Sequence, residues 1–237
     1  VDAYSNMGNV FKDQDKLEEA IEAYQKAISL NPNYSEVYSN IGNILKDKGK
    51  LEEAIKLYNK CISINPDYAK AHNNLGSAFH DQGKLDQAII SYNKAISLDP
   101  NYAEAHHNLS FSLLSSDKIK EGLDKNEWRW KTEGMSWRHF SQPLWDGKES
   151  LKGKRILLWC EQGIGDTLNW ISRLPLIASQ ADHCILECQD KLVPLLERSF
   201  PDIEVKSEDR SLDSKRDDFD VHLPMGSLYK HFIEEIL

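Results

Sequence analysis

The sequence has no long apolar segment and few cysteines. No apolar run approaches the roughly 18 residues that a membrane-spanning helix needs, and the N-terminal residues lack the basic-then-apolar order of a secretion signal. We therefore expect a cytoplasmic protein without a membrane span. Its 4 cysteines form no Cys-x-x-Cys motif and have no histidine at zinc-ligand spacing, which predicts reduced core thiols and no metal site.

Positive charge is scarce relative to negative charge. The chain has 29 lysines and arginines against 38 aspartates and glutamates, and its formal net charge is −9. A protein that binds nucleic acid needs a basic face to neutralise phosphates. This composition argues against nucleic acid and favours a basic partner or a neutral polypeptide backbone.

What the sequence does contain is a 34-residue repeat over its first hundred residues. Small residues, tyrosines and prolines each recur in register, and 34 residues is the period of the tetratricopeptide repeat (TPR) helix pair. The recurring sets are Gly8, Gly42, Gly76 and Ser110; Ala20, Ala54, Ala88 and Gly122; Tyr24, Tyr58 and Tyr92; and Pro32, Pro66 and Pro100. Amphipathic helices alone would not reproduce all four sets together.

The repeat predicts an α-helical TPR solenoid over residues 1–134, with repeats at about 1–34, 35–68, 69–102 and 103–134. One helix pair cannot bury enough apolar surface to fold alone, so the pairs must stack. Ser110 and Asn126 depart from the pattern, which indicates that the fourth repeat is an end unit. The first repeat leaves an apolar end, so self-association through the solenoid end stays open.

Asparagine recurs on the first helix of every repeat. The four members are Asn6, Asn40, Asn74 and Asn108. An amide on each successive helix would form a ladder in the groove, and its donor and acceptor suit the backbone of an extended peptide. The alternative is that these amides bond the neighbouring repeat.

The stretches 2–9 and 71–76, which carry parts of this ladder, resemble the TPR region of the O-linked N-acetylglucosamine transferase family. The resemblance covers roughly residues 1–116. In that family an asparagine ladder lines the superhelix and holds substrate polypeptide. The resemblance therefore implies a protein or extended peptide as the partner of the ladder, and it does not by itself imply the enzyme.

A tryptophan-rich junction follows the fourth repeat. All 6 tryptophans of the chain lie between Trp128 and Trp170, and residues 135–152 read as a linker that is too aromatic to be a flexible tether. Large aromatic side chains favour a buried seam between the last helix and the next domain. A platform on which a sugar stacks is the alternative.

The second half of the chain changes period and predicts a partial Rossmann-like α/β domain with a parallel sheet over residues 153–237. Strands are expected at 154–160, 183–188, 203–205 and 219–223, with helices at 167–179 and 191–200. The charged segment 207–218 reads as a solvated loop.

A glycine turn follows the first expected strand, where parallel sheets bind ligands. Gly163 and Gly165 would let the backbone approach a substrate, and Asp166 is a candidate catalytic carboxylate. Leu168 occupies the place of the third glycine of a dinucleotide fingerprint, which argues against a dinucleotide. The alternative is a tight turn in which Asp166 caps the helix.

Three motifs resemble bacterial TPR proteins that end in a heptosyltransferase-like domain. They are residues 128–130, residues 143–147, and residues 163–166 with 173–175. The resemblance spans residues 103–237 and implies a glycosyltransferase of the GT-B fold, in which Asp166 would be the base that deprotonates the acceptor hydroxyl. Pro175 lies further from Asp166 than in the heptosyltransferases, which puts the acceptor and the activity in question.

The first residue falls at the start of a repeat, and only about 85 residues follow the linker, so we expect a fragment of a longer protein. The leading hypothesis is a TPR scaffold that binds a protein or peptide, attached to a truncated glycosyltransferase-like domain that is inactive and holds no cofactor in this fragment. A transferase that uses a nucleotide sugar in the full-length protein is the alternative. A third reading treats the α/β part as a structural cap.

Overall fold

The computed structural model describes residues 1–135, 137–161 and 163–232. Residue 136 of the expected linker, residue 162 of the glycine turn and the last five residues of the expected α/β domain lie outside the described residues. The chain divides into two compact units, unit 1 (Val1–Thr132) and unit 2 (Glu133–Leu237).

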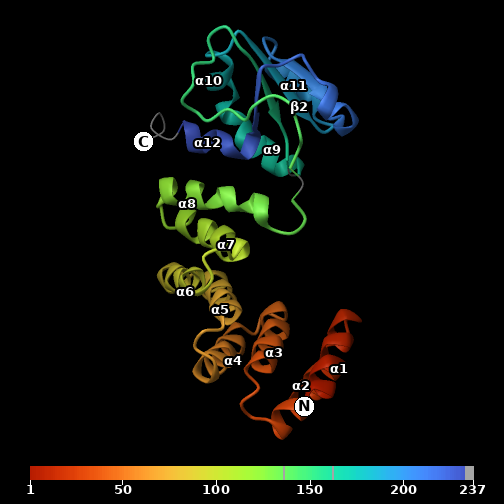
Figure 1. The fold of residues 1–237 in the computed structure, drawn as a ribbon, viewed down its shortest axis with the longest axis vertical. Coiled ribbons are helices and arrows are strands. Elements are labelled where there is room, and N and C mark those ends of the chain that lie inside the picture. Colours follow the sequence, from red (N-terminus) through yellow and green to blue (C-terminus); the bar gives the residue numbers. More distant parts are fainter. Residues whose placement is uncertain (136, 162, 233–237) are drawn as a thin grey trace. The chain divides into compact units, whose positions relative to one another are not determined.

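Unit 1 is a solenoid of helix pairs (Figure 1). Each repeat contributes a first and a second helix, and a 3-10 helix, η1 (Glu127–Lys131), follows the last pair. The pairs are α1 (Asp2–Asp13) with α2 (Leu17–Leu30), α3 (Ser35–Asp47) with α4 (Leu51–Ile64), α5 (Ala69–Asp81) with α6 (Leu85–Leu98), and α7 (Ala103–Leu114) with the shorter α8 (Ile119–Asn126). The predicted TPR solenoid is confirmed.

The turn inside each repeat uses a left-handed residue at one fixed position. Its members are Asp15, Gly49, Gly83 and Asp117, with φ of 59°, 73°, 72° and 58°. Only glycine and, less readily, short polar residues such as aspartate adopt this conformation at low cost. The 34-residue period therefore reaches the backbone angles as well as the side chains.

The recurring glycine and tyrosine pack against each other within each repeat. A Cβ atom placed on Gly42 would lie 2.7 Å from Cε1 of Tyr58, and the corresponding distance is 2.4 Å for Gly8 to Tyr24. Both tyrosines are fully buried. The first helix must therefore carry glycine wherever the second carries this tyrosine, and Ser110 occurs in the repeat where Asn126 replaces the tyrosine.

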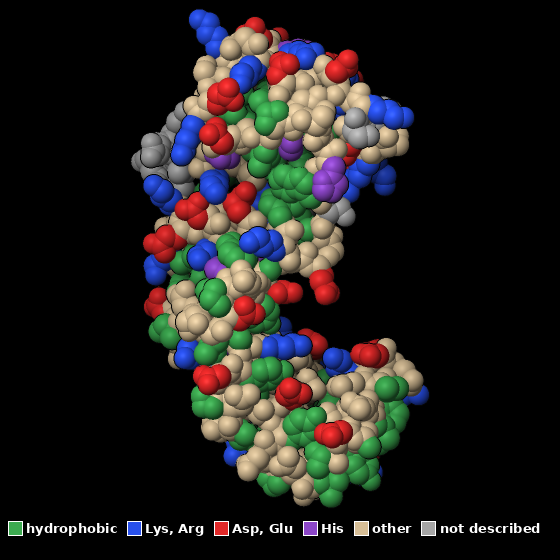
Figure 2. Space-filling view, in the orientation of Figure 1, with side chains coloured by type: hydrophobic (Ala, Val, Ile, Leu, Met, Phe, Trp, Pro, Cys, Tyr) green, Lys and Arg blue, Asp and Glu red, His purple; other side chains and the backbone are tan. Residues whose placement is uncertain are grey.

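Successive repeats bury an apolar seam. In the first seam Ala20, Tyr24 and Ala27 of α2 pack with Val37 and Ile41 of α3. The equivalent surface of α1 has no preceding repeat in this chain, and its large apolar side chains stay exposed. They are Val1, Tyr4, Met7 and Val10, and Figure 2 shows hydrophobic side chains at the surface of this N-terminal end.

Unit 2 contains a four-stranded parallel sheet in the order β3-β2-β1-β4. The strands are β1 (Arg155–Trp159), β2 (His183–Cys188), β3 (Glu204–Ser207) and β4 (Val221–Pro224). The parallel sheet is confirmed. Ile156, Leu158, Leu186 and Leu223 lie in its core, together with the buried Cys160.

The helices of unit 2 differ from the expected ones in one place. A single helix at 167–179 is wrong, because the chain forms α9 (Ile164–Trp170), a 3-10 turn η2 (Ile171–Arg173) and α10 (Leu174–Ala178). Pro175 stands in the first turn of α10, where its missing N–H costs no helical hydrogen bond. The remaining elements are α11 (Val193–Ser199), η3 (Arg210–Lys215), η4 (Met225–Ser227) and α12 (Leu228–His231).

Residues of the expected linker extend the sheet of unit 2. The backbone N–H of Trp145 donates to the carbonyl of His222 in β4 at 2.9 Å, and His222 donates back to Pro143 at 3.2 Å. The Trp145 side chain is buried and donates from Nε1 to the carbonyl of Glu149 at 2.8 Å. This part of the chain is fixed within unit 2 by backbone pairing and aromatic burial.

The expectation of a solvated loop at 207–218 is wrong, because this segment carries part of a buried ion cluster. The Arg138 guanidinium, which is 1% exposed, donates from Nε to Asp213 at 3.0 Å and from Nη1 to Glu187 at 2.6 Å. Arg216 also donates to Glu187. A high density of charge in the sequence indicated solvent, whereas opposite charges from distant positions neutralise one another here.

Candidate functional site

The first helices form the inner face of the solenoid. Residues of α3 contact α5 and residues of α5 contact α7, whereas successive second helices approach one another less. The tighter spacing of the first helices places them on the inside of the curve. We call the surface made by α1, α3, α5 and α7 the inner face, and the four recurring asparagines the ladder.

Three of the four ladder amides bond the preceding repeat. Asn40 donates from Nδ2 to Oδ1 of Asn9 at 3.4 Å, and Asn74 donates to Oδ1 of Asn43 at 2.8 Å. Asn108 donates to Oδ1 of Asn73 at 3.1 Å. Asn6 is exposed at the start of the ladder. The structure thus shows the inter-repeat bonds that the sequence left as an alternative, and all of them use the amide nitrogen.

The acceptors of these bonds are held by the recurring tyrosines. The hydroxyl of Tyr24 donates to Asn9 Oδ1 at 2.6 Å, and that of Tyr58 donates to Asn43 Oδ1 at 2.8 Å. Burial raises the pKa of Tyr24 to about 12, with a smaller contribution from the charge of Asp13. The pKa of Tyr58 is raised for the same first reason. Both hydroxyls therefore stay protonated donors at neutral pH.

Each ladder carbonyl is consequently presented in a fixed orientation. Asn74 uses its amide nitrogen on both Asn43 and the hydroxyl of Ser39, the latter at 3.3 Å. Its Oδ1 is then the group that faces a ligand as a hydrogen-bond acceptor. A row of such acceptors on successive helices matches the N–H groups of an extended polypeptide.

The fourth repeat changes the chemistry of the inner face. Phe111 stands where the first two repeats have Asn9 and Asn43, and it is 48% exposed. Its ring lies 4.9 Å from that of His107, measured between centroids. Burial lowers the pKa of His107, and the charge of Arg129 lowers it further, so the imidazole is neutral at neutral pH.

The ladder was found from the sequence, whereas its supporting residues were not. Asn9 and Asn43 are also 34 residues apart, and this spacing was the available signal. Their role as acceptors required the neighbouring repeat to be in place. Phe111 and His107 break the repeat pattern, and such breaks were read only as marks of an end unit.

The glycine turn lies beyond the carboxyl end of β1. Gly163 precedes α9, and the described residues show no side-chain capping hydrogen bond at this helix N-terminus. A cap by Asp166 is therefore not seen. The side chain of Asp166 is directed toward Gly163, since its Oδ2 would lie 3.7 Å from a Cβ built there.

Neither glycine of this turn is required by backbone or packing. Neither Gly163 nor Gly165 has a positive φ, both are exposed, and a Cβ on Gly165 would have no heavy atom within 4 Å. Across the turn, Gly226 packs tightly against Trp170 and Glu161. The structure thus brings Gly163, Gly165 and Asp166 to one exposed turn, well separated in the sequence from the ladder.

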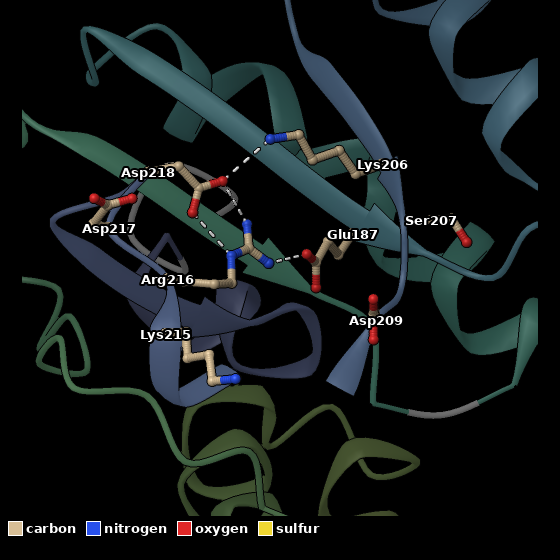
Figure 3. Close-up of a pocket in the computed structure, with 8 residues that line it drawn as sticks. All are labelled: Glu187, Lys206, Ser207, Asp209, Lys215, Arg216, Asp217 and Asp218. Carbon is tan, nitrogen blue, oxygen red and sulfur yellow. Dashed lines mark hydrogen bonds and ion pairs between the residues drawn. The ribbon is translucent and has the colours of Figure 1, made fainter. Parts of the chain in front are cut away.

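A second feature of unit 2 is a charged pocket of about 410 Å³ at the ends of β2 and β3 (Figure 3). Asp218 lies between Arg216 and Lys206, accepting at 2.9 Å from Arg216 Nε and at 3.1 Å from Lys206. Arg216 holds the pKa of Asp218 well below its usual range. Glu187, at the end of β2, is taken up by Arg138 and Arg216. These charges neutralise one another, and the carboxylate position that binds ribose in dinucleotide folds is occupied.

The aromatic junction residues are engaged within their own units. Trp128 stacks on His106 at 3.7 Å, and Lys131 lies over the Trp128 ring at 3.9 Å. Trp159 is fully buried, and Trp137 meets it edge-on at 5.7 Å. Both faces of Trp128 are therefore covered, which removes it from any sugar-stacking platform.

The remaining candidate groups are structural. All four cysteines are free and buried, and burial raises their pKa values to about 11 for Cys61 and Cys188 and about 12 for Cys160 and Cys184. The described residues contain no group of three metal-ligating side chains. No helix in the described ranges is long and apolar enough to span a bilayer.

Comparison with known proteins agrees with the architecture of unit 1. A TPR-repeat family model matches residues 8–47, 42–83 and 76–115. Residues 8–115 are therefore TPR repeats. Protein FlbA of Caulobacter vibrioides is 33% identical over 98 residues, which make up 39% of this chain and 16% of FlbA. The chain thus spans a small part of that relative.

Solved structures resemble the same region. A crystal structure of MamA superimposes with a TM-score of 0.50 at 23% identity, over 55% of this chain and 76% of MamA. The first TPR of Spaghetti (RPAP3), bound to an HSP90 peptide, has a TM-score of 0.47 at 26% identity, over 48% of this chain and 91% of the other. The likeness to MamA shows a shared TPR fold.

Proposed function

We propose that this chain is a protein-interaction scaffold whose inner face binds an extended polypeptide along the ladder. The observation that carries the proposal is the bonding of Asn74, whose amide nitrogen is held by Asn43 and Ser39. Side-chain order is already present before a ligand arrives, so binding loses little further entropy. The net charge of −9 favours a neutral or basic polypeptide.

Selection from a random dodecamer peptide library, followed by fluorescence polarisation, supplies ligands for the test. Each selected peptide is then N-methylated at one backbone nitrogen at a time. If a peptide N–H donates to a ladder carbonyl, methylation at that position weakens binding by about 1 kcal/mol, the usual net value of one hydrogen bond.

The double variant Asn40→Ala with Asn74→Ala identifies the acceptor. It should bind the unmodified peptide more weakly by about 1 kcal/mol or more per lost bond, and N-methylation should then cost nothing further. Asn59→Ala with Asn93→Ala, two exposed positions on second helices, is the matched control. Unaltered affinity in a folded ladder variant would sink the proposal.

A second candidate function rests on the exposed glycine turn of unit 2. Two glycines that neither backbone angles nor packing require leave open space beside Asp166. In a longer protein with a glycosyltransferase domain, Asp166 would act as the base toward an acceptor hydroxyl, with a nucleotide sugar as donor. Sugar transfer by that protein that is unchanged in Asp166→Asn would remove the base assignment.

A further inference from the structure

We infer that the inner face is graded along its length and that its fourth repeat forms an aromatic subsite, made by Phe111 and His107, for one large apolar side chain of the bound polypeptide. This inference rests on the proposed function. It adds a specificity determinant to a ladder that by itself recognises only backbone.

The gradient follows from comparing equivalent positions. The position of Phe111 is held in the earlier repeats by Asn9, Asn43 and Ser77, and that of Leu114 is held by Lys12, Lys46 and His80. The inner face therefore passes from amide and ammonium groups to aromatic and aliphatic groups. An extended chain that follows the ladder meets polar surface first and apolar surface last.

The cross-repeat polar contacts end at the same place. Lys46 donates to Ser77 at 3.1 Å, and His80 Nδ1 lies 2.9 Å from the hydroxyl of Ser112. In the fourth repeat Leu114 takes this position and packs against Gly122 instead. Phe111 remains 48% exposed, although burying its ring would be favourable.

The neighbouring groups select an uncharged, apolar occupant. His107 is half-buried and lies 4.9 Å from Phe111 at an interplanar angle of 51°, an arrangement that leaves a ring face for a third apolar group. Asn108, three residues before Phe111 on the same face of α7, is the last rung of the ladder. A polypeptide held at Asn108 therefore places a side chain beside Phe111.

The test uses the whole chain and the same dodecamer library. Peptides selected on the wild type should carry phenylalanine, tyrosine, tryptophan or leucine at one fixed position relative to the N–H that N-methylation identifies. Changing that side chain to alanine should weaken binding about tenfold. The variant Phe111→Asn, which installs the residue of the first two repeats, should show neither the enrichment nor the tenfold loss.

The control variant is Ile90→Asn, which removes an exposed apolar side chain from a second helix and should leave selection unchanged. Peptides that bind through the ladder without any apolar enrichment would overturn this inference and leave the proposed function standing. Failure to select any peptide overturns both. Self-association of the wild type that Phe111→Asn abolishes, measured by sedimentation equilibrium, would assign the aromatic surface to a second copy and overturn the peptide subsite.

Discussion

Oδ1 of Asn43 accepts two hydrogen bonds at once, from the Tyr58 hydroxyl of its own repeat at 2.8 Å and from Nδ2 of Asn74 in the next repeat at 2.8 Å. This pair joins packing within a repeat to packing between repeats. The same arrangement occurs one repeat earlier with Tyr24, Asn9 and Asn40. The ladder is thus both a recognition surface and part of the internal bonding of the solenoid.

A first prediction concerns the free energy that this bond contributes. Asn43→Ala should destabilise the chain by about 1–3 kcal/mol, because the buried Tyr58 hydroxyl loses its acceptor, and Asn74→Ala by about 1 kcal/mol. A double-mutant cycle from urea unfolding should give a coupling energy of about 0.5–1.5 kcal/mol. Asn93→Ala on α6 is the control. Strict additivity would show that Asn43 and Asn74 do not interact in solution.

A second prediction tests the glycine and tyrosine contact. Gly42→Ala places a Cβ where Tyr58 already lies, at 2.7 Å, so the ring or helix must move. We expect a loss of about 1–3 kcal/mol, the usual range for overpacking. Ser110→Ala, at the equivalent position of the repeat without this tyrosine, should change stability by less than about 1 kcal/mol. Equal thermal melting of the two variants would contradict the packing argument.

A third prediction concerns the pH dependence of unit 2. Burial lowers the pKa of His222 to about 4, and the charge of Arg138 contributes, while Trp159 donates to its Nδ1 at 3.2 Å. The unfolded histidine titrates near 6.5, so stability is fully present above pH 6.5 and is lost as the pH falls toward 4. The loss corresponds to about 3 kcal/mol.

His222→Gln cannot titrate and should lose this dependence between pH 6.5 and 4. Urea unfolding followed by tryptophan fluorescence at several pH values measures it. If the wild type and the variant lose stability in parallel over this interval, His222 is not the responsible group.

A fourth prediction addresses the buried ion cluster. Arg138→Met leaves the carboxylates of Glu187 and Asp213 buried without their main partner, and should destabilise unit 2 by about 3–5 kcal/mol. Lys215→Met removes an exposed cation from the same cluster and should cost less than about 0.5 kcal/mol. Equal unfolding midpoints for these two variants would show that the cluster is solvated.

The two halves of the chain differed in how far the sequence could be followed. The solenoid was predicted because Gly42, Tyr58 and their equivalents recur at a fixed spacing, and local packing alone imposes that spacing. The strands of unit 2 were predicted from their apolar runs. The break after α9 was missed because a helix with a proline in the first turn of its continuation carries the same apolar pattern as an unbroken one.

Sequence alone determined the repeat, the ladder positions and the parallel sheet, since each depends on contacts between residues near in sequence or at a constant interval. Tertiary structure alone decided that the ladder nitrogens bond the preceding repeat, and that Arg138 meets Asp213 and Glu187. Charged and amide side chains look the same in a sequence whether they face water or each other. Their partners are set by the folding of distant segments, which fixes both distance and burial.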